Sequence, residues 1–317
     1  MAVKIVELKN VTKEYGSRLI LDNINLSIEE GDIFGIIGAS GSGKSTLLSM
    51  IVGFLEPDEG QVLYYSPTTG KAYDLIQNLR FLRKQIGFTP QHLSFYPKLT
   101  VKENLLHFGR MYHIPEKVLI DNAKSLLKFT GLWKFRDLLG EEMSGGMQKR
   151  LDIGCSLVHK PKVLILDEPT VDLDPLLRRD LMRLIKEVNK QGMTIIIASH
   201  DHENIELLCN KVAVIHKKHV YAYGSVDELK QKYGQKFGTV RVHTCPTHEK
   251  VMGLLGKSRV PMHGAIDHGT HLTLNTQNLQ GTLQALLRMT SEHHLPFTHV
   301  ELSSPTLRSV FEQITKE

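Results

Sequence analysis

A glycine-rich run at residues 38–46, GASGSGKST, follows an apolar stretch and fits the pattern GxxxxGK followed by Ser or Thr. Its glycines would let the backbone wrap closely, so that successive N–H groups point at phosphate oxygens. Lys44 can reach the β- and γ-phosphates of a nucleotide, and the Ser45 hydroxyl can bind Mg²⁺. A plain tight turn is the structural alternative. The predicted phosphate-binding residues are Gly38, Ala39, Ser40, Gly41, Ser42, Gly43, Lys44, Ser45 and Thr46.

Two adjacent carboxylates end another apolar run, VLILDEPT at 163–170. Asp167 suits Mg²⁺, directly or through water, and Glu168 could accept a proton from an attacking water or orient it. Because neighbouring residues on a strand point to opposite sides, we expect the two carboxylates to have different tasks. The structural alternative is an acidic pair that merely starts a turn. The presence of the phosphate loop makes this alternative weaker than the catalytic interpretation.

A third run, MSGGMQKR at 143–150, suggests a second anion-binding site. Ser144, Gly145 and Gly146 would open a helix and offer backbone N–H groups, a hydroxyl and the positive end of the helix dipole. A Ser-capped helix start made flexible by two glycines is the structural alternative.

This run closely resembles the signature sequence of ATP-binding-cassette (ABC) ATPases, and further motifs occur in the family's order. Tyr15 matches the aromatic residue that stacks on adenine. Gln91 matches the glutamine that links Mg²⁺ and the attacking water to the transporter interface. Asp174 matches the loop that communicates across the dimer, and His200 matches the histidine that contacts the γ-phosphate. The resemblance implies ATP and Mg²⁺ as the bound nucleotide and metal.

The resemblance also implies partners. In the family, two cassettes close on ATP between one phosphate loop and the other's signature, so we expect a second cassette subunit, in the simplest case a homodimer, and a separate transmembrane permease. Two positions depart from the common pattern: Met147 stands where many members have Gln, and Asp172 where Gly is commoner.

The SGGM signature and the tail SPTLRSVFEQIT at 304–315 resemble a branch that energises export permeases. We therefore expect a motor subunit of an exporter at the cytoplasmic face of the membrane. An importer subunit, or a soluble ABC ATPase acting in DNA repair, translation or iron–sulfur assembly, is the alternative. Exposed-looking apolar residues in a groove near Gln91–Arg110 would receive a permease helix: Phe95, Tyr96, Pro97 and Leu99.

The elements that must position these residues are expected to form an α/β domain over 1–235 with a largely parallel sheet. The resemblance implies that this domain is a P-loop NTPase of the ABC type. Ile33–Gly38, Val163–Asp167 and Thr194–Ala198 are continuously apolar, as central strands are. A helical subdomain is expected at about 92–160. The stretch Gln61–Phe88 is expected to be a surface loop.

A second domain, of accessory or regulatory function, is expected at 238–317. Its order of strands and helices is βαββαβ, the ferredoxin-like α+β pattern. Ser304 and Pro305 should begin a terminal helix. This domain holds eight of the sixteen histidines, which we expect to be scattered over its surface, since no spacing resembles that of metal ligands.

Composition limits the remaining function classes. The net charge of +5 comes from scattered residues, among them Lys149 and Arg150, which predicts a solvated surface and no nucleic-acid partner. Three distant cysteines suit unpaired thiols. No apolar run approaches the roughly 18 residues that span a bilayer, and the start of the chain lacks a signal-peptide pattern.

Overall fold

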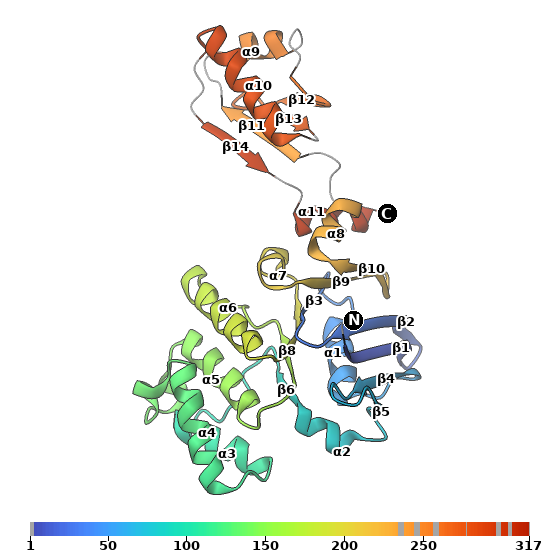
Figure 1. Ribbon diagram of the computed structural model, residues 1–317, viewed down its shortest axis with the longest axis vertical. Coiled ribbons are helices and arrows are strands. Elements are labelled where there is room, and N and C mark those ends of the chain that lie inside the picture. Colours follow the sequence, from blue (N-terminus) through green and yellow to red (C-terminus); the bar gives the residue numbers. More distant parts are fainter. Residues whose placement is uncertain are drawn as a thin grey trace. The chain divides into compact units, whose positions relative to one another are not determined.

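The computed structural model describes residues 3–233, 238–243, 248–255, 260–276, 278–295, 299–303 and 306–316. The chain forms two compact units, Met1–Val226 and Asp227–Glu317, which are described separately (Figure 1). The first unit contains the nucleotide-binding motifs, and the division falls near the start of α8 (Val226–Tyr233).

The strands of the first unit are β1 (Lys4–Tyr15), β2 (Arg18–Glu29), β3 (Ile33–Gly38), β4 (Glu59–Tyr65), β5 (Ala72–Asp74), β6 (Ile86–Thr89), β7 (Val163–Asp167), β8 (Thr194–Ser199), β9 (Lys211–His216) and β10 (His219–Ser225). Its helices before α8 are α1 (Lys44–Val52), α2 (Leu79–Leu82), α3 (Val101–Met111), α4 (Glu116–Phe129), α5 (Gly145–Leu157), α6 (Pro175–Lys190) and α7 (His202–Leu208). Three short 3₁₀ turns complete the described part: η1 (Arg83–Gln85), η2 (Trp133–Phe135) and η3 (Gly140–Glu142).

A six-stranded sheet in the order β10-β9-β3-β8-β7-β6 carries the site. Five of its strands are parallel, and only β10 runs antiparallel to its neighbour. The strands β3, β7 and β8 are buried along their whole length, which explains their unbroken apolar sequence. The predicted parallel α/β sheet is thereby confirmed. The phosphate loop, the carboxylate pair, His200 and Gln91 all follow carboxyl ends of its adjacent strands.

A second, antiparallel sheet in the order β2-β1-β4-β5 was not expected from the sequence. Its two long strands pair with register shifts, one of them between Leu8 and Val11, which break the alternation of buried and exposed residues. Asn10 and Asn23 adopt left-handed backbone conformations within these strands. The period-two signal is therefore interrupted, and sequence periodicity alone does not reveal the strands.

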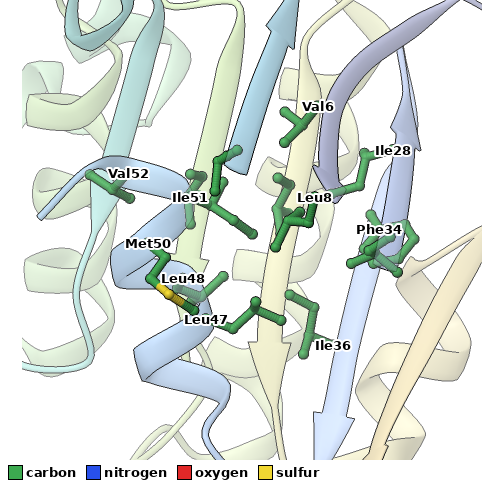
Figure 2. Close-up of a cluster of buried hydrophobic side chains, with 14 of the residues drawn as sticks. Val6, Leu8, Ile28, Phe34, Ile36, Leu47, Leu48, Met50, Ile51 and Val52 are labelled. Atoms are coloured by element: carbon green, nitrogen blue, oxygen red, sulfur yellow. The ribbon is translucent and has the colours of Figure 1, made fainter. Parts of the chain in front are cut away.

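The expectation that Gln61–Phe88 is a surface loop is wrong. This stretch contains most of β4, then β5, α2 and η1, and leads into β6. Val62 and Tyr64 are buried in the main core, where side chains of both sheets and of α1 meet. Figure 2 shows Leu47, Leu48 and Ile51 of α1 within this cluster. The core therefore joins the phosphate-loop helix to the antiparallel sheet.

The predicted helical subdomain contains α3, α4 and α5 around a separate core. Thr100 and Glu103 form a capping box at the start of α3. Phe95 is only 6% exposed and lies in this core, so the expectation that it is exposed is wrong. Tyr96 is 47% exposed, as expected.

The Glu7 carboxylate on β1 accepts hydrogen bonds from Lys4 and Tyr65 and allows a prediction about acid stability. Burial raises the pKa of Glu7, but hydrogen bonds from Lys4, Tyr65 and Lys9 outweigh this and lower it to about 2. Because this folded-state pKa lies below the ordinary glutamate value of 4.5, the stabilising contribution of Glu7 is present above pH 4.5 and is lost as the pH falls towards 2. In Glu7→Gln, the midpoint of thermal unfolding should depend less on pH within this interval. The exposed Glu30, changed to Gln, should leave the wild-type pH dependence intact; an equal flattening there would contradict the assignment.

The second unit contains, after α8, the elements β11 (Gly238–His243), α9 (His248–Leu255), β12 (Gly264–Asp267), β13 (Leu272–Thr276), α10 (Leu279–Glu292), β14 (His299–Ser303) and α11 (Leu307–Lys316). Its antiparallel sheet has the order β12-β13-β11-β14, which is the ferredoxin-like arrangement expected from the sequence. Side chains of the sheet, α9 and α10 form its core. The predicted helix start at Ser304 and Pro305 lies outside the described residues.

No helix in the described ranges has the length and apolar character needed to cross a membrane.

Candidate nucleotide-binding site

The phosphate loop connects the end of β3 to the start of α1. A Cβ atom on Gly38 would lie 2.4 Å from the Ser42 hydroxyl oxygen, and Gly43 has a φ of 99°, so the turn requires glycine at both positions. Ala39, Ser40 and Gly41 are exposed. The loop thus presents backbone N–H groups and a helix N-terminus to solvent, the arrangement that binds phosphate.

Lys44 lies beneath this loop and is only 7% exposed. Its ammonium group donates to the carbonyl oxygens of Gly38 and Ala39 at 3.0 and 3.1 Å. Burial lowers the pKa of Lys44, and the carboxylates of Glu168 and Asp167 oppose this shift. A buried cation at the centre of the loop is well placed to meet a phosphate.

Asp167 ends β7 with a side chain that suits a hard metal ion. Burial raises its pKa, while a hydrogen bond with the Ser45 side chain and the charges of Lys44 and Lys149 act in the other direction. Its Oδ1 atom is buried without a hydrogen-bond partner in the described part of the chain. A hydroxyl and an unsatisfied carboxylate oxygen are the ligand types that Mg²⁺ prefers, so the residues present fit this ion.

Glu168 is placed differently from the sequence-based prediction. It lies beyond the end of β7 with a φ of 46°, so the alternation of side chains along a strand does not apply to it. Its carboxylate accepts hydrogen bonds from the Ser199 hydroxyl at 2.9 Å and from the His200 backbone N–H at 3.0 Å. His200 Nδ1 lies 2.8 Å from Oε1 of Glu168. The turn therefore holds Glu168 and His200 together, although a left-handed backbone costs a glutamate about 1 kcal/mol or more.

Tyr15 and Gln91 are accessible but are not joined to the residues described above. Tyr15 ends β1 with half of its surface exposed, and the Lys13 ammonium lies 5.9 Å from the centre of its ring. Gln91 follows β6 and is exposed. In the described ranges, no hydrogen bond joins its side chain to Ser45 or Asp167.

The signature residues lie at the N-terminus of α5. Ser144 is the N-cap residue, yet its side chain makes no capping hydrogen bond. Ser144 and Gly145 are exposed, whereas a Cβ atom on Gly146 would come within 2.8 Å of Leu177 at the start of α6. The Ser-capped alternative is thus unsupported here, because the exposed hydroxyl makes no hydrogen bond to the helix end.

Asp174 caps α6 next to this packing contact. Its carboxylate accepts hydrogen bonds from the backbone N–H groups of Leu176 and Leu177 at 2.9 and 3.0 Å. Asp174 therefore caps α6, the helix whose Leu177 packs against Gly146. Asp172 has a φ of 62°, a left-handed conformation that favours glycine and that an aspartate can adopt.

Buried polar residues that sequence reasoning missed hold the loop after β6. Lys149 is only 8% exposed and donates to the Gln91 carbonyl oxygen at 2.7 Å, so its prediction as a surface residue is wrong. Asp152 accepts from the backbone N–H of Ser94 at 3.1 Å and from its hydroxyl. Asn104 makes hydrogen bonds to both backbone groups of Tyr96. The sequence did contain one indication that Lys149 and Asp152 act together: they are three residues apart, and residues at this spacing share a helix face.

Comparison with known proteins identifies the family. Residues 21–171 match the family model described as ABC transporter. The chain is 30% identical to the linearmycin resistance ATP-binding protein LnrL of Bacillus subtilis, over 98% of each chain. It is 34% identical to the Nod factor export ATP-binding protein I of Burkholderia lata, over 72% of this chain and 73% of the relative.

Among solved structures, cbiO1 from Clostridium perfringens, part of the ABC transporter complex cbiONQ, has a TM-score of 0.66 and 31% identity, covering 73% of this chain and 92% of that one. The similarity to these cassettes confirms the predicted P-loop NTPase fold and the use of ATP with Mg²⁺. The protein is an ATPase whose hydrolysis serves transport, and the chain belongs to the ATP-binding subunits of the ABC transporter family.

Proposed function

We propose that this chain is the motor subunit of an exporter, in which two cassettes close on ATP and drive a separate membrane permease from its cytoplasmic face. The observation that carries the proposal is the exposed signature at the start of α5, whose Ser144 hydroxyl makes no hydrogen bond to its own helix. It is a second anion site besides the phosphate loop. A second copy would bring its signature to this chain's ATP, and this chain's signature to the other.

The residues around the phosphate loop have distinct tasks in this proposal. Lys44 and the loop N–H groups hold the phosphates, and Ser45, Asp167 and Gln91 hold Mg²⁺, which neutralises charge on the phosphate oxygens when bound. Glu168 orients the attacking water and takes its proton. His200, 57% exposed at its side chain and hydrogen-bonded to Glu168, contacts the γ-phosphate.

The exporter assignment rests on the relatives. LnrL, similar over nearly its whole length, is named for antibiotic resistance, and the Nod factor relatives are named for export. An Escherichia coli relative, 31% identical over 71% of this chain, is named a probable multidrug ABC transporter ATP-binding protein. The importer and soluble-ATPase alternatives lack comparable support among these relatives.

A groove in the first unit supports docking of a permease. It has a volume of about 530 Å³, and a mainly apolar set of residues lines it: Val52, Phe54, Arg83, Ile86, Phe88, Pro90, Ser94, Phe108, Tyr112, Cys155 and Ser156. Phe54 is 57% exposed and packs edge-on against Phe88. Large exposed aromatic residues in a concave site are typical of protein interfaces. The groove takes its apolar character from these residues, whereas the predicted Phe95 is buried.

Changing Phe54 and Phe108 to Ser should therefore weaken the complex with the permease. We expect at least a tenfold loss of permease copurified from detergent-solubilised membranes, because truncating an aromatic anchor of an interface costs about 2 kcal/mol or more. ATP hydrolysis by the isolated chain should stay near the wild-type rate, since neither side chain belongs to the nucleotide site.

The matched control is Phe81→Ser. Phe81 is 54% exposed but does not line the groove, so this variant should copurify with the permease as the wild type does. If the groove variant copurifies equally well and supports transport, the docking proposal is wrong, whereas the ATPase assignment stands.

A further inference from the structure

Four histidines form a row across the sheet of the second unit, one from each strand or its end. His268 follows β12, His271 precedes β13, His243 ends β11 and His299 begins β14. His243 and His299 are direct cross-strand partners. Since Val242 pairs with Leu272, His271 is the neighbour of His243 on the other side. Residues spread over more than fifty positions of sequence therefore meet at one end of one sheet.

The row lies on the face of the sheet that the helices leave open. Val242 and Leu272 point into the core with α9 and α10. The adjacent residues His243 and His271 consequently point to the opposite face, because side chains alternate along a strand. Both are half-buried there, and His299 is 62% exposed at its side chain.

The imidazole rings are in contact along the row. Ring centres are 4.6 Å apart for His268 and His271, 5.2 Å for His271 and His243, and 5.7 Å for His243 and His299. Two imidazoles that share one zinc ion at a Zn–N distance of about 2.1 Å have ring centres roughly 5 Å apart. The ring-centre distances of His271–His243 and of His243–His299 are thus close to that of two imidazoles on one ion.

A carboxylate beside the row is placed to support one of its imidazoles. Glu301 Oε1 lies 3.4 Å from His299 Nε2, and Glu301 also accepts a hydrogen bond from Arg241 at 2.9 Å. A carboxylate next to a ligating histidine is a common support of metal sites.

We propose that this row binds one divalent transition-metal ion of the zinc class, with His271, His243 and His299 as ligands. Neighbouring strands are about 4.8 Å apart, so the backbones of His271 and His299 lie about 10 Å apart on either side of β11. To share an ion, both side chains must turn towards His243. In the described ranges, no three His, Cys, Asp or Glu groups already converge on one point, and the His243 and His271 rings stack at 27°. Binding therefore turns these side chains about their χ angles, and His268 stacks on His271 from outside the ligand set.

The test is calorimetric titration of Zn²⁺ into the full chain, freed of metal with a chelator, at neutral pH and without nucleotide. The wild type should bind one Zn²⁺ per chain at this site. His299→Ala should weaken binding at least tenfold, because outer-shell changes alone cost 10–100-fold and this variant removes a ligand. His243→Ala should weaken it further. His299 is exposed on an edge strand, so its variant keeps the test valid if His243→Ala fails to fold.

The matched control is His263→Ala. His263 is exposed just before β12, at the opposite end of that strand from His268, and its variant should bind Zn²⁺ as the wild type does. Absence of a Zn²⁺ site in the wild type would overturn the proposal. So would a site that survives in His299→Ala and His243→Ala but disappears in His200→Ala, since the ion would then occupy the nucleotide site.

Discussion

Replacing Glu168 with Gln is expected to slow Mg²⁺-dependent ATP hydrolysis by about 10²–10⁴-fold, the usual range for loss of a general base. The amide cannot accept a proton from water, yet it can keep the local structure. Its oxygen can take the hydrogen bond from the His200 N–H, and its NH₂ group can face the Ser199 hydroxyl, which also accepts. The effect is therefore chemical, and ATP binding should remain intact.

Two measurements separate this result from misfolding. Nucleotide affinity should match the wild type, and ATP should trap the variant as a dimer, because hydrolysis no longer releases it. Glu203→Gln, which removes an exposed carboxylate from the start of α7, should hydrolyse ATP at the wild-type rate. Full activity in Glu168→Gln, or hydrolysis by a strict monomer, would show that Glu168 has another role.

Replacing Ser144 with Arg is expected to reduce hydrolysis by about 10²-fold or more, the cost of removing one preorganised donor from a charged transition state. The arginine side chain would cover the exposed end of α5, where the second copy's ATP is proposed to bind. The phosphate loop is unchanged, so ATP should still bind to the monomer with wild-type affinity. The ATP-dependent dimer should be lost, which size-exclusion chromatography with light scattering would detect.

A mixture of variants tests whether the site is shared between copies. Lys44→Ala chains lack an intact phosphate loop, and Ser144→Arg chains lack an intact signature. Mixing them should restore part of the activity, because a heterodimer contains one site built from two intact halves. Ser125→Arg, an exposed change on α4, is the matched control for added charge and should leave hydrolysis unaltered. Loss of monomeric ATP binding in Ser144→Arg, or no recovery on mixing, would contradict a site built from two chains.

The chemical motifs and their supporting strands could be predicted because their signals are local in the sequence. The phosphate loop requires glycines at set positions, and β3, β7 and β8 are continuously apolar because they are buried on both faces. The parallel sheet then brings Gly38, Asp167 and His200 to one edge, since the carboxyl ends of parallel strands meet there. Motif order and strand type together determined the nucleotide site.

Only the tertiary structure decided the features that depend on residues distant in sequence. The antiparallel sheet was missed because register shifts interrupt its alternation. Lys149 was predicted to be solvated, but it is buried because its ammonium finds the Gln91 carbonyl oxygen 58 positions away. The histidines of the second unit show no ligand-like spacing along the chain, yet strand pairing places four of them side by side. The sequence shows the type of each residue and its neighbours along the chain. Burial and cross-strand contacts depend on residues that come together only when the chain folds.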